Sequence, residues 1–417
     1  MSTGLLALLA FSPILLAAVL LIGLRWPAKH AMPLVYMLTA GVALYAWDMS
    51  FNRVLASTVQ GLLITLGLLW IIFGAILLLN TLKHSGGITA IRAGFATISP
   101  DRRIQAIIIA WLFGCFIEGA SGFGTPAAIA APLLVAIGFP AMAAVMLGML
   151  VQSTPVSFGA VGTPIIVGIN TGLDSATIGA QLVEQGSSWA QFLQLITSEV
   201  AIIHATVGTV MPLVMVLMLT RFFGSEKSWK AGFEVLPFAL FAGLAFTIPY
   251  ALTGVFLGPE FPSLAGGLIG LAIVTSAARM GFLLPKTTWD FAPVDKWPAE
   301  WLGSVEMKLE QLTAKPMSAL RAWLPYMLVG LLLVISRVFP EVSAALKAVM
   351  LNFPDLLGET GISANFQPLY LPGGILVTVV IATFFFHGMK LRDLGSAVKE
   401  SSGVLLSAGF VLLFTVP

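Results

Sequence analysis

One glutamate, Glu118, lies inside an apolar run of the sequence, directly before a loop rich in glycine. The run reads GCFIEGASGFGTPAAIAAP and spans residues 114–132. Behind the glutamate come three glycines and a Thr-Pro pair: Gly119, Gly122, Gly124, Thr125 and Pro126. Burial disfavours an ionised carboxylate, so Glu118 is a candidate proton carrier. The alternative is a structural clamp, in which the carboxylate accepts hydrogen bonds from the backbone of residues 120–124.

Thr-Pro pairs begin at Thr125, Thr154 and Thr163, close together in the chain. Threonine is a good N-cap, and proline suits the first position of a helix because its missing N–H would have no partner there. The segments SGFGTPAAIA and GAVGTPIIVG therefore each predict a half-helix that begins within the membrane. Half-helix N-termini offer free N–H groups and a partial positive charge to a small anion. An ordinary proline kink in a helix bundle is the alternative.

The composition is that of a membrane protein. The chain is 58% hydrophobic and 10% charged, whereas a soluble domain carries about 25% charged residues. Apolar runs such as 54–79 are long enough to cross a bilayer core of about 30 Å. We predict an all-α polytopic protein whose partner is the lipid bilayer. The net charge of +2 gives no sign of nucleic-acid binding, and no His/Cys/Asp spacing resembles a metal or cofactor site.

Ten stretches are candidate spans, in addition to the segment 104–138. They are 4–24, 34–47, 54–79, 141–170, 192–220, 231–257, 263–279, 322–336, 371–387 and 403–417. One set of alternate loops carries 18 of the 21 Lys and Arg residues: 25–33, 80–103, 221–230, 279–321 and 388–400. The positive-inside rule places these loops in the cytoplasm and the N-terminus outside. We expect a multi-pass protein of the bacterial inner membrane.

The segment 104–138 holds two apolar arms, 104–118 and 125–138. At 1.5 Å per residue each arm is about 22 Å long, too short to span comfortably. An odd number of crossings must separate the cytoplasmic loop before residue 104 from the external loop after residue 170. A re-entrant hairpin that enters from the cytoplasm and returns meets this requirement, with 141–170 as the one crossing. Two thin full crossings would satisfy it too.

The chain divides into five regions by this pattern. They are scaffold spans at 1–99, the hairpin and broken helix at 100–170, further spans at 171–279, a polar cytoplasmic connector at 280–320, and the start of a second repeat at 321–417.

The segments GCFIEGASGFGTPAAIAAPLLVAIGF and QSTPVSFGAVGTPIIVGINTGLD, within 114–174, resemble the bacterial L-lactate permease family, which also takes up glycolate. The resemblance implies import of 2-hydroxymonocarboxylates coupled to protons. It also implies the ion-transporter fold, in which two inverted repeats each contain a hairpin and a broken helix. Sodium coupling and a homodimer stay open. Family members continue through several more spans, so we expect a complete first repeat and a truncated second one.

The predicted site follows from both breaks. Glu118 is the expected proton-coupling residue. The expected substrate-binding residues are Gly119, Ala120, Ser121, Gly122, Gly124, Thr125, Thr154, Ser157, Gly159, Gly162 and Thr163.

Two other classes of function compete with a symporter. Residues Gly119 to Gly122 fit the Gly-x-Ser-Gly motif of intramembrane serine proteases, which also need a histidine base. His204 is the one histidine deep in a span, but its distance of five residues from Glu199 favours a polar contact within the bundle. An anion channel is the third class. The prediction is a transporter and not an enzyme.

Overall fold

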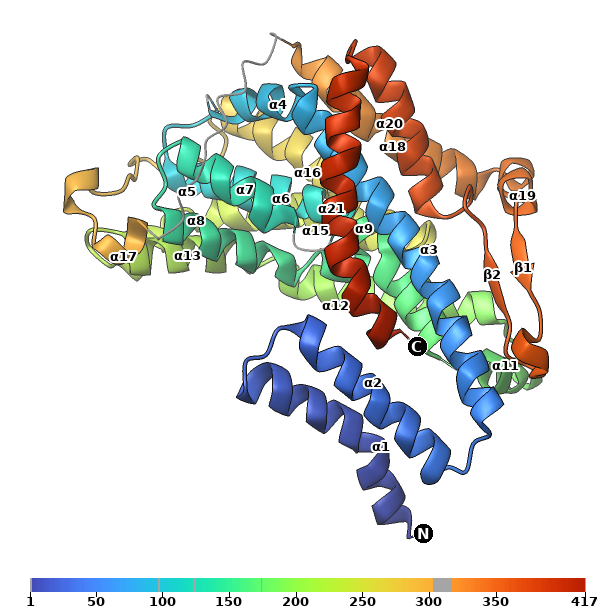
Figure 1. Ribbon diagram of the computed structural model, residues 1–417. Coiled ribbons are helices and arrows are strands. Elements are labelled where there is room, and N and C mark those ends of the chain that lie inside the picture. Colours follow the sequence, from blue (N-terminus) through green and yellow to red (C-terminus); the bar gives the residue numbers. More distant parts are fainter. Residues whose placement is uncertain (1, 97, 123–124, 174, 303–316, 417) are drawn as a thin grey trace. The chain divides into compact units, whose positions relative to one another are not determined.

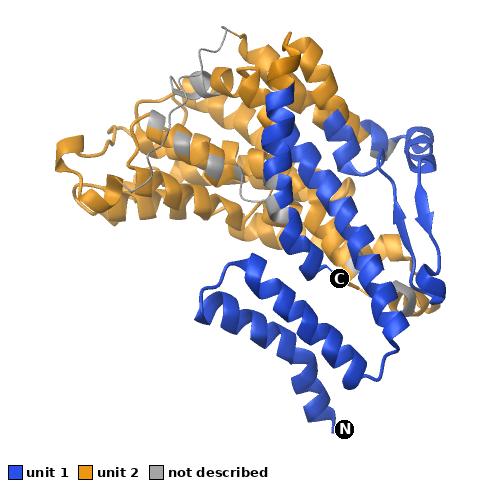
Figure 2. Cartoon of the chain, viewed as in Figure 1, with its two compact units in different colours: residues 1–77, 335–377, 395–417 blue, residues 78–334, 378–394 orange. Residues whose placement is uncertain are grey.

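The computed structural model describes residues 2–96, 98–122, 125–173, 175–302 and 317–416, and helices dominate this part of the chain (Figure 1). The predicted all-α polytopic class is therefore confirmed. The chain forms two compact units, which Figure 2 distinguishes by colour. Unit 1 comprises Met1–Leu77, Ile335–Val377 and Gly395–Pro417, and unit 2 comprises Leu78–Val334 and Thr378–Leu394.

Unit 1 combines the N-terminal helices with parts of the C-terminal region. Its elements, some of which continue into unit 2, are α1 (Thr3–Ala18), η1 (Val19–Gly23), α2 (Ala28–Tyr45), α3 (Phe51–His84), α18 (Ala319–Val338), α19 (Pro340–Ala348), β1 (Leu351–Phe353), η7 (Leu356–Gly358), β2 (Ala364–Phe366), α20 (Pro372–Phe386) and α21 (Leu391–Thr415).

Small residues and one indole fix the packing inside unit 1. A Cβ on Gly74 of α3 would lie 2.8 Å from the carbonyl oxygen of Gly373 in α20, so the two backbones touch. The Trp70 indole donates a hydrogen bond of 2.8 Å to the carbonyl of Pro368. Strands β1 and β2 pair antiparallel, with Leu351 opposite Phe366.

Unit 2 carries both breaks that the sequence predicts. Its elements are α4 (Gly87–Ala96), α5 (Arg102–Gln105), η2 (Ala106–Phe113), α6 (Gly114–Ser121), α7 (Thr125–Ala136), α8 (Ala141–Leu150), η3 (Val151–Ser153), η4 (Val156–Phe158), α9 (Gly159–Thr163), η5 (Pro164–Ile169), α10 (Asn170–Gly172), α11 (Ser175–Glu184), α12 (Trp189–Gly208), α13 (Met211–Phe223), α14 (Trp229–Phe233), α15 (Leu236–Phe256), α16 (Pro262–Arg279), η6 (Val294–Lys296) and α17 (Ala299–Leu302), with parts of α3, α18, α20 and α21.

The core of unit 2 is one continuous helix, Arg102–Ser121, in which a π-helical segment, η2, joins α5 to α6. Residues 103–121 are all buried. Between its charged base and Glu118, residues 106–117 are apolar on every side, as expected for a helix surrounded by other helices. Two large side chains, Trp111 and Phe113, have no exposed surface.

This helix and α7 form the predicted hairpin, with one difference. The first arm has 20 residues rather than 15, which is long enough to cross a membrane. It starts earlier than predicted because the Asp101 side chain caps it and bonds to Arg103, so the charges at its base are paired. The Arg102 guanidinium donates to the carbonyl of Ile137, beyond the end of α7. The two ends of the helix pair therefore meet, as expected both for a re-entrant hairpin and for two full crossings.

Within the described residues, seven helices are long and apolar enough to cross a membrane, or up to eight if the bent pair around residues 154–155 counts as one span. The sequence predicted about ten spans. Two of its candidates, 34–47 and 371–387, do not meet the criterion, and 403–417 lies partly outside the described residues. Helix α20 has only 15 residues, and α2 carries Lys29 and His30 in its first turn, which lower its mean hydropathy.

Candidate substrate-binding site

Glu118 lies on the last turn of α6 and is only 2% exposed. Its backbone carbonyl accepts a hydrogen bond of 2.8 Å from the N–H of Gly122, which ends the helix. Its carboxylate lies against Gly159 of the second break, where an added Cβ would be 2.9 Å from Oε1. Helix α6 thus places the predicted proton carrier directly beside the interrupted backbone of another element.

Gly122 joins the two breaks. Its φ of +62° favours glycine, and a Cβ there would lie 2.7 Å from both the Cβ and the N of Ala160. Because any larger residue would collide with Ala160, glycine permits the close approach of α6 and α9. We name the group Glu118, Gly122, Gly159 and Ala160 the tip site.

The second break lies at Thr154-Pro155, where the helix pair Ala141–Ser153 and Val156–Ile169 bends by 67°. A bend of this kind leaves carbonyl groups without their helical donors. Three side chains from other helices satisfy them. His204 Nδ1 (2.9 Å) and the Tyr250 hydroxyl (3.1 Å) donate to the carbonyl of Thr154, and the Ser263 hydroxyl (2.8 Å) donates to that of Pro155.

The hydrogen bonds of His204 also fix its tautomer when the ring is neutral. A carbonyl only accepts, so Nδ1 carries the proton and Nε2 presents a lone pair. The Ser157 hydroxyl lies 3.3 Å from that Nε2. His204 therefore holds both the break and one of the predicted substrate-binding hydroxyls. The sequence shows that His204 lies deep in an apolar span, but it does not indicate that the ring bonds to the carbonyl of Thr154.

Three consecutive residues of α9 have left-handed backbone: Ala160 (φ 42°), Val161 (φ 57°) and Gly162 (φ 78°). Such φ values are uncommon for alanine and outlying for the β-branched Val161, and strain of this kind persists where the surrounding structure imposes it. The Thr163 hydroxyl donates a hydrogen bond of 2.6 Å to the carbonyl of Ala160 and closes the turn. Pro164 then starts the second half-helix, as predicted.

A second carboxylate, Glu260, also lies at this turn and is not among the predicted site residues. It is 9% exposed and belongs to the loop between α15 and α16. A Cβ on Gly162 would collide with the carbonyl of Pro259 and lie 3.0 Å from the N of Glu260. The only sequence signal was an acidic residue between two prolines in GPEFP, which reads as an ordinary connection between spans.

The structure brings most of the predicted site residues together, but these residues make different kinds of contact. Gly119 packs on α16, where a Cβ would lie 2.7 Å from the N of Leu264. The Thr154 side chain lies against Gly208 of α12, so its carbonyl rather than its hydroxyl forms the break. Ala120 and Ser121 are buried. Gly124 lies outside the described residues, as does the side chain of Thr125.

An ion-pair cluster holds the other end of the same helix; we name Asp101, Arg103, Glu234 and Thr287 the base cluster. Arg103 is fully buried and bonds to Asp101 (2.7 Å) and Glu234 (3.0 Å). It also donates 2.7 Å to the carbonyl of Thr287. The hydrogen bond from Arg103 is the main reason why the pKa of Glu234 lies below its usual value.

A buried carboxylate at an interrupted helix, inside a bundle of membrane-crossing helices, is the arrangement typical of secondary transporters. The profile of the family described as L-lactate permease matches residues 6–416. The chain therefore belongs to the L-lactate permease family, whose members are permeases and not enzymes.

Individual relatives agree with the family. The L-lactate permease of Escherichia coli (strain K12) is 30% identical over 98% of this chain and 73% of its own length. Glycolate permease GlcA of the same strain is 28% identical, over 99% and 74%. The L-lactate permease of Bacillus subtilis (strain 168) is 29% identical, over 86% and 64%. No solved structure matches the chain.

Proposed function

We propose that the protein imports L-lactate and related 2-hydroxymonocarboxylates such as glycolate, by proton symport across the bacterial inner membrane. The observation that carries the proposal is the position of Glu118, buried on α6 and in contact with Gly159 of the broken helix. The names of the relatives support the substrates. The distribution of basic residues supports an N-terminus outside the cell.

In this mechanism the interrupted backbone and Glu118 act together. The start of the half-helix at Thr163-Pro164 and the hydroxyl of Ser157 receive the carboxylate and hydroxyl groups of the substrate. Glu118 takes up one proton when the anion binds, so the loaded site gains no net charge. Loading the site therefore adds no charge to the low-dielectric core, where an extra unpaired charge would be costly. Release of substrate and proton on the other side completes the cycle.

The test is transport by the full chain in proteoliposomes. With Glu118→Gln we expect the loss of L-lactate accumulation driven by an inward proton gradient, because the site can no longer bind and release a proton. Exchange of labelled lactate should survive in part, since exchange can proceed with a permanently neutral site. Glu118→Asp should retain some driven uptake at a shifted pH optimum.

Glu199→Gln is the matched control. Glu199 is the other carboxylate deep in a predicted apolar span, but the structure places it on the exposed side of α12, so driven uptake should persist. Accumulation by Glu118→Gln with unchanged pH dependence would exclude Glu118 as the coupling site. Accumulation that follows a sodium gradient at constant pH would replace the proton by sodium. Uptake that never exceeds equilibrium would favour a channel.

A further inference from the structure

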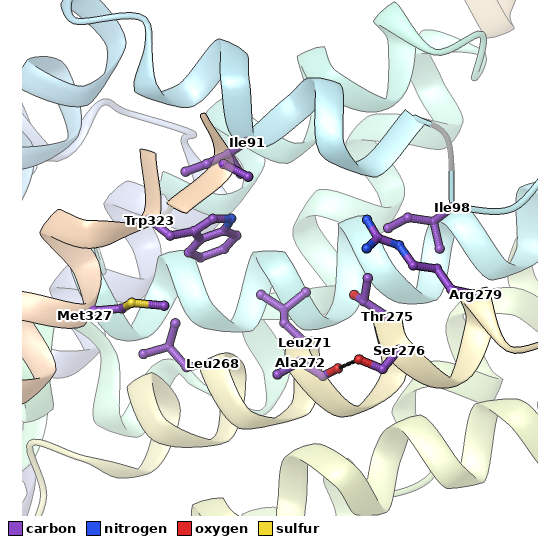
Figure 3. A pocket seen from close by; sticks show the side chains of 11 residues that line it. Ile91, Ile98, Leu268, Leu271, Ala272, Thr275, Ser276, Arg279, Trp323 and Met327 are labelled. Carbon is purple, nitrogen blue, oxygen red and sulfur yellow. Dashed lines mark hydrogen bonds between the residues drawn. The ribbon is translucent and has the colours of Figure 1, made fainter. Parts of the chain in front are cut away.

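A cavity that none of the tip-site residues line lies between α16, the start of α18, and residues Ile91 and Ile98. Its volume is about 310 Å³. Figure 3 shows Trp323 and Ile91 at one end and Arg279 at the other, with Leu271 and Thr275 between them. This volume is at the lower end of the range of small-molecule pockets, roughly 300–1,000 Å³.

The polar end of the cavity is suited to a carboxylate. Arg279 stands on the last turn of α16, and no acidic side chain in the described part of the chain pairs with it. Its planar guanidinium can bind a carboxylate through two parallel hydrogen bonds. Thr275 lies four residues earlier and so on the same helix face. The neighbouring Ser276 hydroxyl is already bonded to the carbonyl of Ala272, at 2.7 Å.

The opposite end is apolar and aromatic. Leu271 and Ile91 line it, and Trp323 forms its end wall. Such a wall gains free energy by covering an aliphatic or aromatic group. The cavity is larger than lactate requires, and its two ends differ in polarity. Its shape and chemistry therefore match an anion with a bulky apolar body.

The end wall also connects to the helix of Glu118. The Trp323 ring lies 5.4 Å, between centroids, from that of Phe116, which precedes Glu118 on α6. The Tyr326 ring lies 4.7 Å from Phe116 in an edge arrangement. Phe116 and Tyr326 are buried, and together with Trp323 their packed rings close the cavity on the side of α6.

We propose that this cavity is a second anion site, which binds 2-hydroxymonocarboxylates whose side chain is larger than the methyl group of lactate. The carboxylate binds Arg279 and Thr275, and the apolar body packs against Leu271, Ile91 and Trp323. Acids held there are not carried through the aromatic wall; they restrict its movement and so inhibit lactate transport. That the ligand is a 2-hydroxy acid rests on the proposed function. Binding of the ligand to the cavity is measured independently of lactate transport.

The test uses 3-phenyllactate as the probe and the purified full chain in detergent, with binding measured by calorimetry. Arg279→Gln should weaken binding by about tenfold or more, because a hydrogen bond to a charged group is lost. Ala272→Phe should also abolish binding, since Ala272 lines the cavity and is exposed, so a larger side chain fills the space without disturbing the core. In proteoliposomes, both variants should resist inhibition by 3-phenyllactate.

Arg221→Gln is the matched control. Arg221 is also an arginine in the last turn of a long helix, α13, but its guanidinium bonds to the carbonyl of Lys227. Arg221→Gln should bind the probe like the unmodified chain. Unchanged binding in both Arg279→Gln and Ala272→Phe would overturn the proposal, as would equal weakening in Arg221→Gln. If the protein binds 3-phenyllactate as expected but does not transport lactate, the proposed function is wrong and the proposed anion site stands.

Discussion

The two ends of the helix Arg102–Ser121 each hold a buried carboxylate, and the surroundings of the two carboxylates differ. At the base, Asp101 and Glu234 surround the fully buried Arg103, so every charge of the cluster has an opposite partner. At the tip, Glu118 lies against Gly159, on a backbone that is itself irregular.

The difference separates a structural role from a functional one. A buried ion pair whose partners are all matched keeps its protonation state fixed, and the loss of one partner leaves an uncompensated charge. The Glu118 carboxylate lies instead against the backbone of Gly159, beside a turn with three left-handed residues. The helix therefore carries an ion-pair cluster at its base and, at its tip, the carboxylate that we propose as the coupling site.

The largest expected effect comes from opening the base cluster. Arg103→Met should destabilise the protein by about 3–5 kcal/mol, because it leaves Asp101 buried without its partner. The measurement is the amount of monodisperse protein extracted from the membrane and its unfolding temperature.

Arg53→Met is the control for that variant. The ion pair of Arg53 with Glu359 is 3.6 Å long, and the arginine is half exposed. Its loss should cost less than about 1 kcal/mol, as for other exposed pairs. If Arg103→Met is as stable as Arg53→Met, the base cluster is not what holds the hairpin.

A smaller effect is expected at the tip, where Gly159→Ala tests the contact with Glu118. Gly159 has φ −66° and ψ 157°, which alanine adopts without strain. The new methyl group would lie 2.9 Å from Oε1 and displace the carboxylate. We expect a roughly tenfold loss of proton-driven lactate uptake, since small misplacements of a reacting group are costly, with an amount of folded protein near that of the unmodified chain.

Two further variants make that result specific. Gly168→Ala, in the same broken element, has no atom within 4 Å of the added Cβ and should transport normally. Glu118→Asp combined with Gly159→Ala should recover uptake relative to Gly159→Ala alone, because the shorter side chain makes room for the methyl group. Equal uptake by Gly159→Ala and Gly168→Ala would show that the position of Glu118 does not matter.

The smallest effect is the pH dependence of the base cluster. The pKa of Glu234 is lowered in the folded protein, so its pair with Arg103 contributes stability above the unfolded pKa of about 4.3. That contribution is lost as the pH falls through the folded pKa. It should amount to less than about 1 kcal/mol, because the Glu234 side chain is 42% exposed and solvent screens the interaction.

Thermal unfolding at pH 7 and below pH 4 measures the stability that the pair of Glu234 and Arg103 contributes. The unmodified protein should lose more stability over that interval than Glu234→Gln, which has no carboxylate to protonate. An identical loss in both would mean that other groups account for the acid sensitivity.

The local elements of the tip site could be predicted, since they depend on residue types that act within a few positions. Glu118 was identified because an acidic residue is conspicuous in an apolar run. The half-helix that starts at Pro164 followed from the Thr-Pro pair and its neighbouring glycines. The role of Gly122 was predicted only in part: its irregular backbone was expected, but its contact with Ala160 was not.

By itself, the sequence determined the class of the protein, the hairpin, and the place of Glu118 within it, because composition and periodicity reflect the solvent that each segment faces. Only the tertiary structure decided which groups meet at the second break. His204, Tyr250 and Ser263 come from three separate helices to satisfy the carbonyls of Thr154 and Pro155. The buried position of Glu260 was likewise decided by helix packing. Hydrogen bonds between distant segments depend on how helices pack, and no pattern local to the chain specifies that arrangement.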